Sequence, residues 1–201
     1  MQAYLNKFPK LFYTKDNKTT VVTNLLVRIA TIKGNIDPAA IYYQYDIQEG
    51  DTPEIIAHKY YGDSGYHWVV MLFNDIYDPF YDWPMTYQQF TEFIISKYGS
   101  QAAALSTTKQ YEKIVSTTDG YSQTTTSNTY IIDLTSYTNL IPSTITKSFP
   151  NGTTVKIETS KRLLDAYTHE LELNESKRKI KLIKKELIGS VKKQFDMLMG
   201  A

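Results

Sequence analysis

Residues 42–84 read "YYQYDIQEGDTPEIIAHKYYGDSGYHWVVMLFNDIYDPFYDWP" and hold ten Tyr or Trp side chains, and this stretch decides the fold. A segment this aromatic is either a core or a surface that grips a partner. Residues 41–47 are rich in β-forming side chains and predict a strand. Thr52 followed by Pro53 predicts a helix N-cap with proline in the first helical position, and Gly62 ends that helix.

Two further helices are predicted beyond Gly62. "YHWVVMLF" (66–73) reads as a second short helix, and "YQQFTEFIISKY" (87–98) reads as a third. The segment "DIYDPFYDWP" (75–84) connects these two helices, and its Pro79 and Pro84 exclude a helical conformation there. Four apolar side chains of the first two helices are expected to be plain core: Ile56, Tyr60, Trp68 and Leu72.

The segment before residue 41 predicts a β-hairpin and a short helix. "KLFYTKDNKTTVV" (10–22) forms two β-rich runs around the Asp16-Asn17 turn. "NLLVRIATI" (24–32) then reads as a helix capped by Thr23.

The segment 101–158 changes character, because 12 of the 24 residues from 106 to 129 are Ser or Thr. That composition is also typical of a linker. Runs with β character lie within it, however, and Asp119-Gly120 and Asn151-Gly152 are strong hairpin turns. We therefore expect a small β-meander rather than disorder.

The last segment, 159–201, is charged and reads as a helical arm. Leu163, Tyr167 and Leu171 are spaced by four, "KIKLI" (179–183) alternates like a short strand, and a second stripe of apolar residues follows. This stripe consists of Ile183, Leu187, Val191, Phe195 and Met199. A single helix is marginal in water, so the stripe must be buried. We expect it to dock on another subunit; the alternative is that it folds back onto the β-meander of its own chain.

Composition limits the classes of function. The net charge of +1 argues against a chain that binds nucleic acid over its whole surface, and the absence of Cys excludes disulfides and thiolate metal sites. Neither a signal peptide nor a membrane span is evident, so we expect a soluble protein. The chain has seventeen Tyr and eight Phe, which indicates many rings whose hydroxyl edge can contact water, and protein interfaces favour such rings.

The order strand, Glu-Gly-Asp-Thr, helix, Tyr-Gly-Asp, helix, Asn resembles the LysM domain. The residues that carry the resemblance are Tyr45, Gly50, Asp51, Thr52, Ile56, Ala57, Tyr60, Gly62 and Asn74. The resemblance implies a βααβ module that binds N-acetylglucosamine polymers between the loop after its first strand and the loop before its second. The family's second strand, with its Gly-Gln pair, is not found after Asn74, where "DIYDPFYDWP" stands instead.

The run from Tyr60 to Gly99 resembles the baseplate wedge protein numbered fifty-three of contractile-tailed bacteriophages, in which a LysM-like core leads into Asn-Asp-x-x-Asp-Pro-Phe-Tyr-x-Trp and a helix. Counted generously, the resemblance covers 4–100 and 160–198. The β segment between these ranges is not covered. Together with the segments described above, we expect an α+β fold with four parts: 1–40 hairpin and helix, 41–100 LysM-like βαα core with an added helix, 101–158 β-meander, 159–201 helical arm. The resemblance implies the LysM-like core. It also implies a non-catalytic virion subunit, present in several copies, made in the host cytoplasm and contacting wedge and hub-proximal neighbours.

The residues expected at the partner interface belong to the aromatic loop and the arm: Tyr77, Asp78, Pro79, Phe80, Tyr81, Trp83, Ile180, Leu182, Ile183, Leu187, Val191 and Phe195. Core packing remained an equal alternative for the rings of the loop. The alternative function is a carbohydrate-binding LysM module, although we expect no glycan to bind.

No chemistry is evident in the sequence. His58, His67 and His169 match no common zinc spacing, and the aspartates of the loop match no calcium loop. We therefore expect no enzyme activity, no cofactor, no metal and no membrane. The basic run 177–185 is flanked by glutamates and interleaved with Ile and Leu, so a solvated face or a strand added to a partner's sheet explains it at least as well as nucleic acid.

Overall fold

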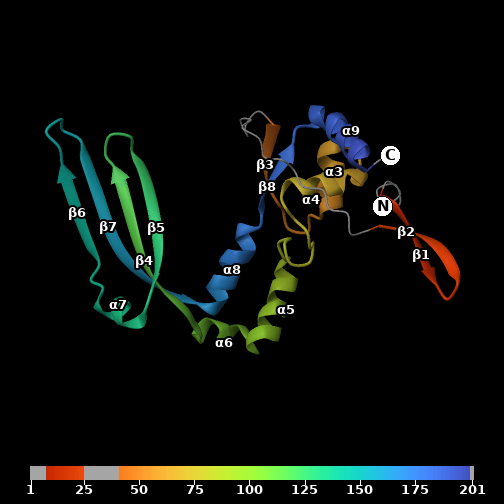
Figure 1. Cartoon of the computed structure of the whole chain (residues 1–201). Helices are drawn as coiled ribbons and strands as arrows, with labels where there is room; N and C mark the ends of the chain where they lie inside the picture. The colour runs from red at the N-terminus through yellow and green to blue at the C-terminus, as the bar shows by residue number, and fades with distance from the viewer. Residues whose placement is uncertain (1–7, 25–40, 200–201) are drawn as a thin grey trace. The chain divides into compact units, whose positions relative to one another are not determined.

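The computed structural model describes residues 8–24 and 41–199, and the chain divides into two compact units. The first unit takes in the described residues up to Thr86 and those from Glu175 onward; the second spans Tyr87–Asn174. Helices and strands occur in both units, which confirms the α+β class (Figure 1).

The first unit is built on two short strands and two helices. Strand β3 (Tyr42–Asp46) leads to helix α3 (Pro53–Tyr61), and a 3-10 turn, η1 (Ser64–Tyr66), leads to helix α4 (His67–Phe73). Strand β8 (Lys179–Ile183) then pairs antiparallel with β3, with Tyr45 opposite Ile180.

This pairing corrects the expectation that the second strand is missing. The strand is present, but it comes from the basic run near the C-terminus, and the whole second unit is inserted between α4 and β8. Along the chain these two strands and two helices follow in the order β3, α3, α4, β8, and the two strands pair with each other. The LysM resemblance implies the same order, β, α, α, β. Descent from LysM domains as such stays a prediction.

The ends of α3 form as the sequence predicts. The Thr52 hydroxyl accepts a hydrogen bond from the Ile55 amide at 3.3 Å, and Pro53 occupies the first turn. Gly62 ends the helix with a φ of 85°, a left-handed conformation that glycine adopts without strain, and its amide donates to the His58 carbonyl.

The core of this unit lies where α3 and α4 cover the two strands. Ile56, Val69, Val70 and Leu182 are almost completely buried there. Tyr60 and Trp68 pack against the same cluster but are only partly buried, because their rings reach its rim.

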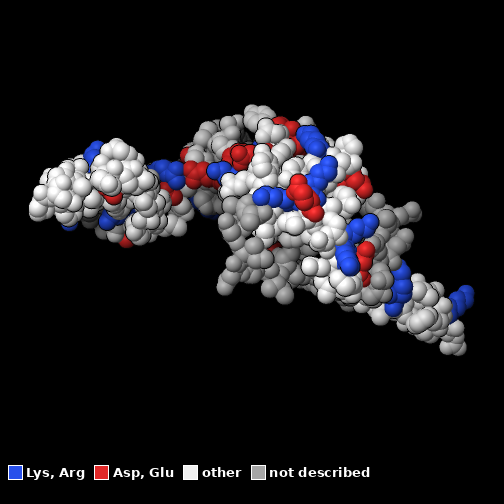
Figure 2. Space-filling model, turned by 90° about the horizontal axis from the view of Figure 1, so that it is seen from above, with Lys and Arg blue, Asp and Glu red and all other residues white. Residues whose placement is uncertain are grey.

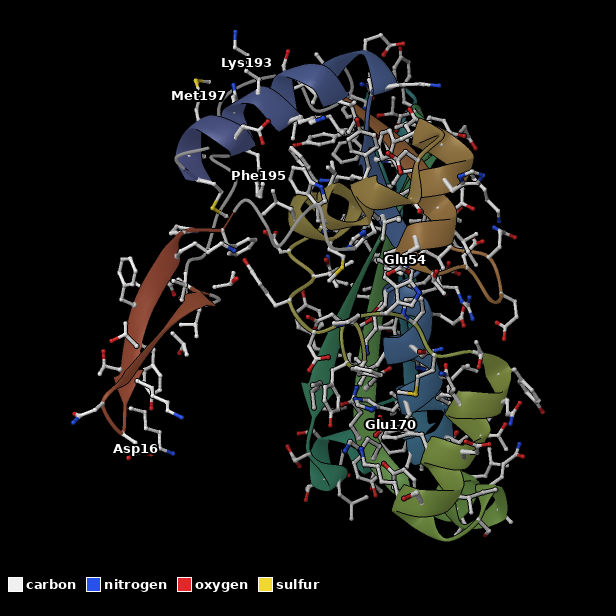
Figure 3. All side chains as sticks on the ribbon, turned by 90° about the vertical axis from the view of Figure 1, so that its right-hand side faces the viewer. Asp16, Glu54, Glu170, Lys193, Phe195 and Met197 are labelled. Atoms are coloured by element: carbon white, nitrogen blue, oxygen red, sulfur yellow. The ribbon has the colours of Figure 1, made fainter. Side chains whose placement is uncertain are left out.

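The C-terminal arm folds onto this same core. After a 3-10 turn, η2 (Lys185–Leu187), helix α9 (Ile188–Met199) follows, and Leu187, Ile188 and Val191 pack against the core cluster. Phe195 lies 4.5 Å from the Trp68 ring, centroid to centroid. Figure 3 shows Phe195 pointing inward from α9, whereas Lys193 and Met197 point away.

Several of the residues predicted at the partner interface are instead part of the core of their own chain. Five side chains that we expected to meet a partner are buried within their own chain: Trp83, Ile180, Leu182, Ile183 and Phe195. Leu187 and Val191 are partly buried against the core. The stripe packs on the βααβ core of its own chain, because pairing of β8 with β3 brings α9 directly onto that core. Docking of the arm on another subunit stays a prediction.

The predicted N-terminal hairpin is confirmed as β1 (Lys10–Lys15) and β2 (Lys18–Thr23), paired antiparallel around Asp16 and Asn17. Both turn residues have positive φ, at 52° and 59°, as a two-residue hairpin turn requires. The helix predicted over 24–32 lies outside the described residues, apart from Asn24.

The second unit joins three helices to a four-stranded sheet. Helix α5 (Tyr87–Tyr98) and α6 (Gln101–Ser106) lead into the sheet, and α8 (Ala166–Ser176) leads out of it. The Phe90 and Tyr167 rings pack edge to face at 5.6 Å, so α5 and α8 run side by side (Figure 1). Lys97 and the Tyr98 hydroxyl both hydrogen-bond to Glu170, which fastens the two helices further.

The sheet consists of β4 (Thr108–Asp119), β5 (Thr124–Ile132), β6 (Ser143–Ser148) and β7 (Thr154–Asp165), with α7 (Leu134–Asn139) between β5 and β6. The strand order is β5-β4-β7-β6, so the segment is not a meander. It is two hairpins joined through their long strands, because β4 and β7 pair along nearly their whole length.

The boundary expected at residue 158 falls inside β7, which continues to Asp165. Leu163 therefore lies on a strand, and the stripe predicted through Leu163, Tyr167 and Leu171 does not belong to one helix. The spacing of four misled the prediction because residues 160–165 have both helical and β-compatible side chains, and only pairing with β4 decides between them.

Candidate functional site

Two of the signature residues, Tyr45 and Asp51, meet at a buried carboxylate, that of Asp51, which is 6% exposed. One carboxylate oxygen accepts hydrogen bonds from the Tyr45 hydroxyl at 2.7 Å and the Gln48 amide at 3.1 Å, and the other accepts from Lys59 at 2.6 Å. Burial alone raises the pKa of Asp51, but together these donors outweigh it and hold the pKa below its usual value. Burial and the bond to Asp51 raise the pKa of Tyr45 to about 12.

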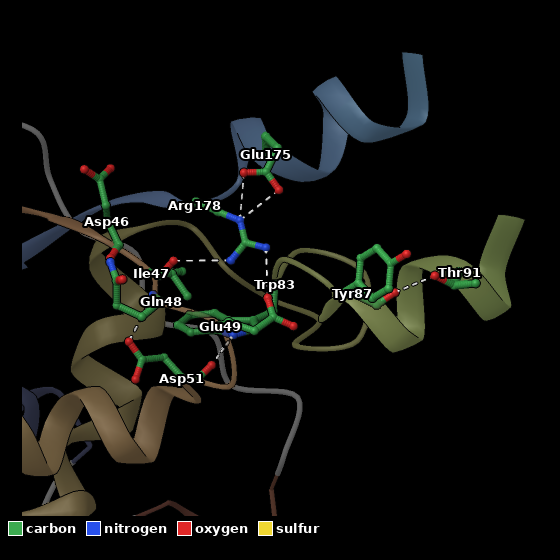
Figure 4. A network of polar contacts seen from close by, with 10 residues as sticks. All are labelled: Asp46, Ile47, Gln48, Glu49, Asp51, Trp83, Tyr87, Thr91, Glu175 and Arg178. Atoms are coloured by element: carbon green, nitrogen blue, oxygen red, sulfur yellow. Dashed lines mark hydrogen bonds and ion pairs between the residues drawn. The ribbon is translucent and has the colours of Figure 1, made fainter. Parts of the chain in front are cut away.

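This buried carboxylate organises the turn after β3 and connects it to the aromatic loop. The Trp83 indole donates to the Asp51 carbonyl at 2.9 Å (Figure 4). Arg178, directly before β8, donates to the Ile47 carbonyl at 3.3 Å and also pairs with Glu49 and Glu175. The turn after β3 is therefore held by its own chain, from the loop on one side and from the entry to β8 on the other.

Asn74, the last signature residue, fastens α4 to β8. Its amide nitrogen donates to the carbonyls of Val70 and Lys181, and its oxygen accepts from the Lys181 amide at 2.7 Å. The side chain thus satisfies both polar groups of one β8 residue, so its role is structural.

The aromatic loop, which we define as residues 75–83, exposes three rings. Tyr77 is 70% exposed, Phe80 85% and Tyr81 74%, whereas Trp83 at its end is buried. The sequence left core and partner contact equally open for these rings. The structure divides them: Trp83 anchors the loop, and the other three face solvent.

Hydrogen bonds fix the shape of this loop. The Asp82 carboxylate accepts from the amides of Tyr77 and Asp78, both at 3.0 Å, and these bonds lower the pKa of Asp82. The Asp78 carboxylate accepts from the Phe80 amide at 2.8 Å, and Lys177 donates to the Tyr81 carbonyl. The rings are therefore presented on a preformed turn.

Sequence reasoning missed Lys177, which lies 96 positions from Tyr81 of the loop, and Arg178, which lies 131 positions from Ile47 of the turn. We assigned both to a basic run that forms a solvated face or a strand added to a partner's sheet. No local signal distinguishes a lysine that reaches a distant carbonyl from one that reaches water.

Within residues 8–24 and 41–199, no three His, Cys, Asp or Glu side chains gather to hold a metal ion. None of the helices in the same ranges has the length and apolar character needed to cross a bilayer. On the face seen in Figure 2, acidic and basic side chains are interspersed with uncharged surface, unlike the basic band of a nucleic-acid binder.

Fold and site together define an α+β protein with a βααβ core and a preformed loop of exposed aromatic rings. The chain belongs to the phage family described as base plate wedge protein 53, whose model matches residues 5–116. It is also similar to the baseplate wedge protein gp53 of Enterobacteria phage T4, with 35% identity over 54 residues. That match covers 27% of this chain and 28% of the T4 protein.

Family membership makes the protein a virion component, located in the tail baseplate. The family match covers the hairpin, the βααβ core up to α4, the aromatic loop and the start of the sheet. Strand β8 and the arm lie beyond it.

Proposed function

We propose that the protein joins neighbouring subunits of the baseplate wedge and that its aromatic loop is the contact surface. The family supplies the setting. The single observation that carries the proposal is the exposure of Tyr77, Phe80 and Tyr81 on a turn that is already rigid.

The free energy of binding depends on how much conformational entropy the aromatic loop loses when it meets a partner. Large rings supply most of the binding free energy in protein interfaces, and ordering a mobile loop subtracts from it. Here the carboxylates of Asp78 and Asp82 have already fixed the backbone that carries the rings. Little conformational entropy remains to be lost, so burying three aromatic side chains gives a net gain.

The role is structural rather than catalytic. The charged networks around Asp51 and Glu170 are internally satisfied by donors of the same chain, and each connects elements of the fold. They therefore account for their residues without a substrate. Wedge neighbours and hub-proximal subunits, in several copies per virion, are the partners that this role requires.

The test is a Phe80→Ala, Tyr81→Ala double variant in reconstitution with the other wedge proteins of the same phage. We expect the free protein to melt at an unchanged temperature, because both rings are exposed. Joining of wedges, followed by sedimentation and electron microscopy, should fall by roughly tenfold or more, since interface rings of this kind contribute upward of ~2 kcal/mol.

A Tyr121→Ala variant is the matched control, because Tyr121 is 84% exposed but lies in the turn between β4 and β5. Normal wedge joining by the double variant, or an equal defect in the control, would refute the assignment of the loop.

A carbohydrate-binding module is the second candidate, and completion of the βααβ order by β8 favours it. The bonds of Trp83 and Arg178 count against it. They connect the turn after β3 to the loop and to the entry of β8, which is where the resemblance places the sugar groove. We expect no binding of N-acetylglucosamine oligomers in calorimetric titration; saturable micromolar binding, about 8 kcal/mol, would revive this function.

A further inference from the structure

Strand β5 leaves one edge of the four-stranded sheet open. Among the described residues it pairs only with β4, and the register of that pair runs without a bulge from Tyr111 to Asp119. Its sequence, TTTSNTYII, contains no charge, no Pro and no Gly. Eight of its nine residues are exposed.

An edge of this kind is unusual, because proteins protect open edges with lysines, prolines, bulges or very short strands. The other edge follows that rule: β6 has six residues and carries Lys147. Figure 2 shows mostly uncharged surface over the sheet. Strand β5 is therefore suited to accept an added strand, with backbone hydrogen bonds supplying the affinity.

The hairpin β1–β2 is the second β element that lacks a covering partner. Within residues 8–24 and 41–199 its strands pair only with each other, and a two-stranded hairpin by itself is marginally stable in water. Phe12 is 80% exposed and Val21 61%, and Leu11 and Val22 are 47% and 39% exposed, so both faces of the hairpin leave apolar area in water. Phe12 and Val21 are directly opposite each other, whereas Leu11 pairs with Val22 on the other face.

We propose that the hairpin β1–β2 of one copy of this chain adds to the β5 edge of a second copy. The chemistry of the two strands matches: β2 reads KTTVVT and β5 reads TTTSNTYII, so threonines and β-branched residues meet across the new pair.

Charge selects this pairing over others. The hairpin carries Lys10, Lys15 and Lys18, and Lys15 lies opposite Lys18 at its tip. Pairing of two hairpins, or of a hairpin with β6 beside its Lys147, brings like charges together. Among the strands of residues 8–24 and 41–199, only β5 offers a long edge with no charge of its own.

Such a contact is heterologous, because different surfaces of the two copies meet. Contacts of this type generate closed rings or open chains rather than isolated dimers. The inference depends on the proposed function only in that copies must be neighbours, and it does not use the aromatic loop. Loss of one interface leaves the other intact, so the two tests fail separately.

Cross-linking tests the proposal on the full chain, which has no cysteine of its own. Thr20→Cys in the hairpin and Asn128→Cys in β5 are made as separate variants, mixed in equal amounts and treated with a short bismaleimide. We expect cross-linked heterodimers at roughly tenfold or more above a mixture of Thr20→Cys with Tyr121→Cys, because docking raises the effective concentration of the paired thiols. Tyr121 is similarly accessible but lies off the edge.

A Val21→Lys change in the Thr20→Cys chain should reduce the heterodimer yield to the control level, since it adds a fourth lysine to the hairpin, in the middle of the strand β2 that meets the neutral edge. Folding is monitored by circular dichroism, which should not change. Heterodimer yields equal to the control would overturn the proposal. So would cross-linking of Asn128→Cys chains mainly with themselves, which indicates pairing of two β5 edges instead.

Discussion

Replacement of Phe195 by Ala tests whether the C-terminal arm belongs to its own chain. Phe195 is 4% exposed and packs against Trp68 at 4.5 Å, against Phe8 at 6.5 Å and beside Met199. The substitution removes the ring that fastens α9 to α4 and leaves a cavity that neighbouring side chains fill only in part.

The magnitude follows from this environment. Truncation of a buried Phe to Ala costs about 3–5 kcal/mol. We expect about 3 kcal/mol, because the cluster around Phe195 is small and Trp68 at its rim is partly exposed, so the site can relax. For a chain of this size, that loss lowers the melting temperature by roughly 6–12 °C.

Tryptophan fluorescence is the suitable assay, because the two tryptophans of the chain, Trp68 and Trp83, both lie in the first unit. Unfolding in urea followed by their emission therefore reports on that unit without a contribution from the second. Met197→Ala is the matched control: Met197 lies on the same helix, is 63% exposed, and should change stability by less than about 0.5 kcal/mol.

Equal stability of the two variants would refute the reasoning. It would mean that α9 is not docked on the core of the free protein. Its apolar stripe would then be buried only on binding another subunit, as the sequence by itself indicated.

Two other perturbations test the remaining contacts. Asn74→Ala removes both hydrogen bonds to the backbone of Lys181 and leaves polar groups of β8 without that partner, so the first unit should lose about 2 kcal/mol by the same fluorescence assay; an unchanged urea midpoint would contradict the role of Asn74. Acid should destabilise both units, because hydrogen-bonded donors, working against burial, hold the pKa values of Asp51, Glu112 and Glu170 below normal. A carboxyl group whose pKa is lower in the folded than in the unfolded protein contributes stability above its unfolded pKa and loses that contribution as the pH falls through its folded pKa. The contribution of these three groups should therefore be constant above about pH 5, and the melting temperature should fall as the pH drops through about 4 and below. A melting temperature that rises on acidification would be inconsistent with these networks.

The local elements were determined by the sequence itself. Thr52, Pro53 and Gly62 define both ends of α3 through the φ and hydrogen-bonding preferences of those residue types, and Asp16-Asn17 defines a hairpin turn for the same reason. The alternation of "KIKLI" was sufficient to predict β8. The family was also recognisable from sequence, because its motif lies in one continuous stretch.

Only the tertiary structure decided where these elements go. The alternation within β8 states that one face is buried, but it does not state that β3, more than 130 residues earlier, supplies the neighbouring strand. The stripe from Leu187 to Phe195 required burial without specifying the surface. Trp83 is buried in the core cluster and donates to the distant Asp51 carbonyl, and nothing in the local sequence separates it from the exposed Phe80. Hydrophobic burial is not directional, and a backbone hydrogen bond does not depend on the identity of the side chains. The local sequence therefore does not specify the partner in either interaction. The choice is made when all the elements compete for the same core.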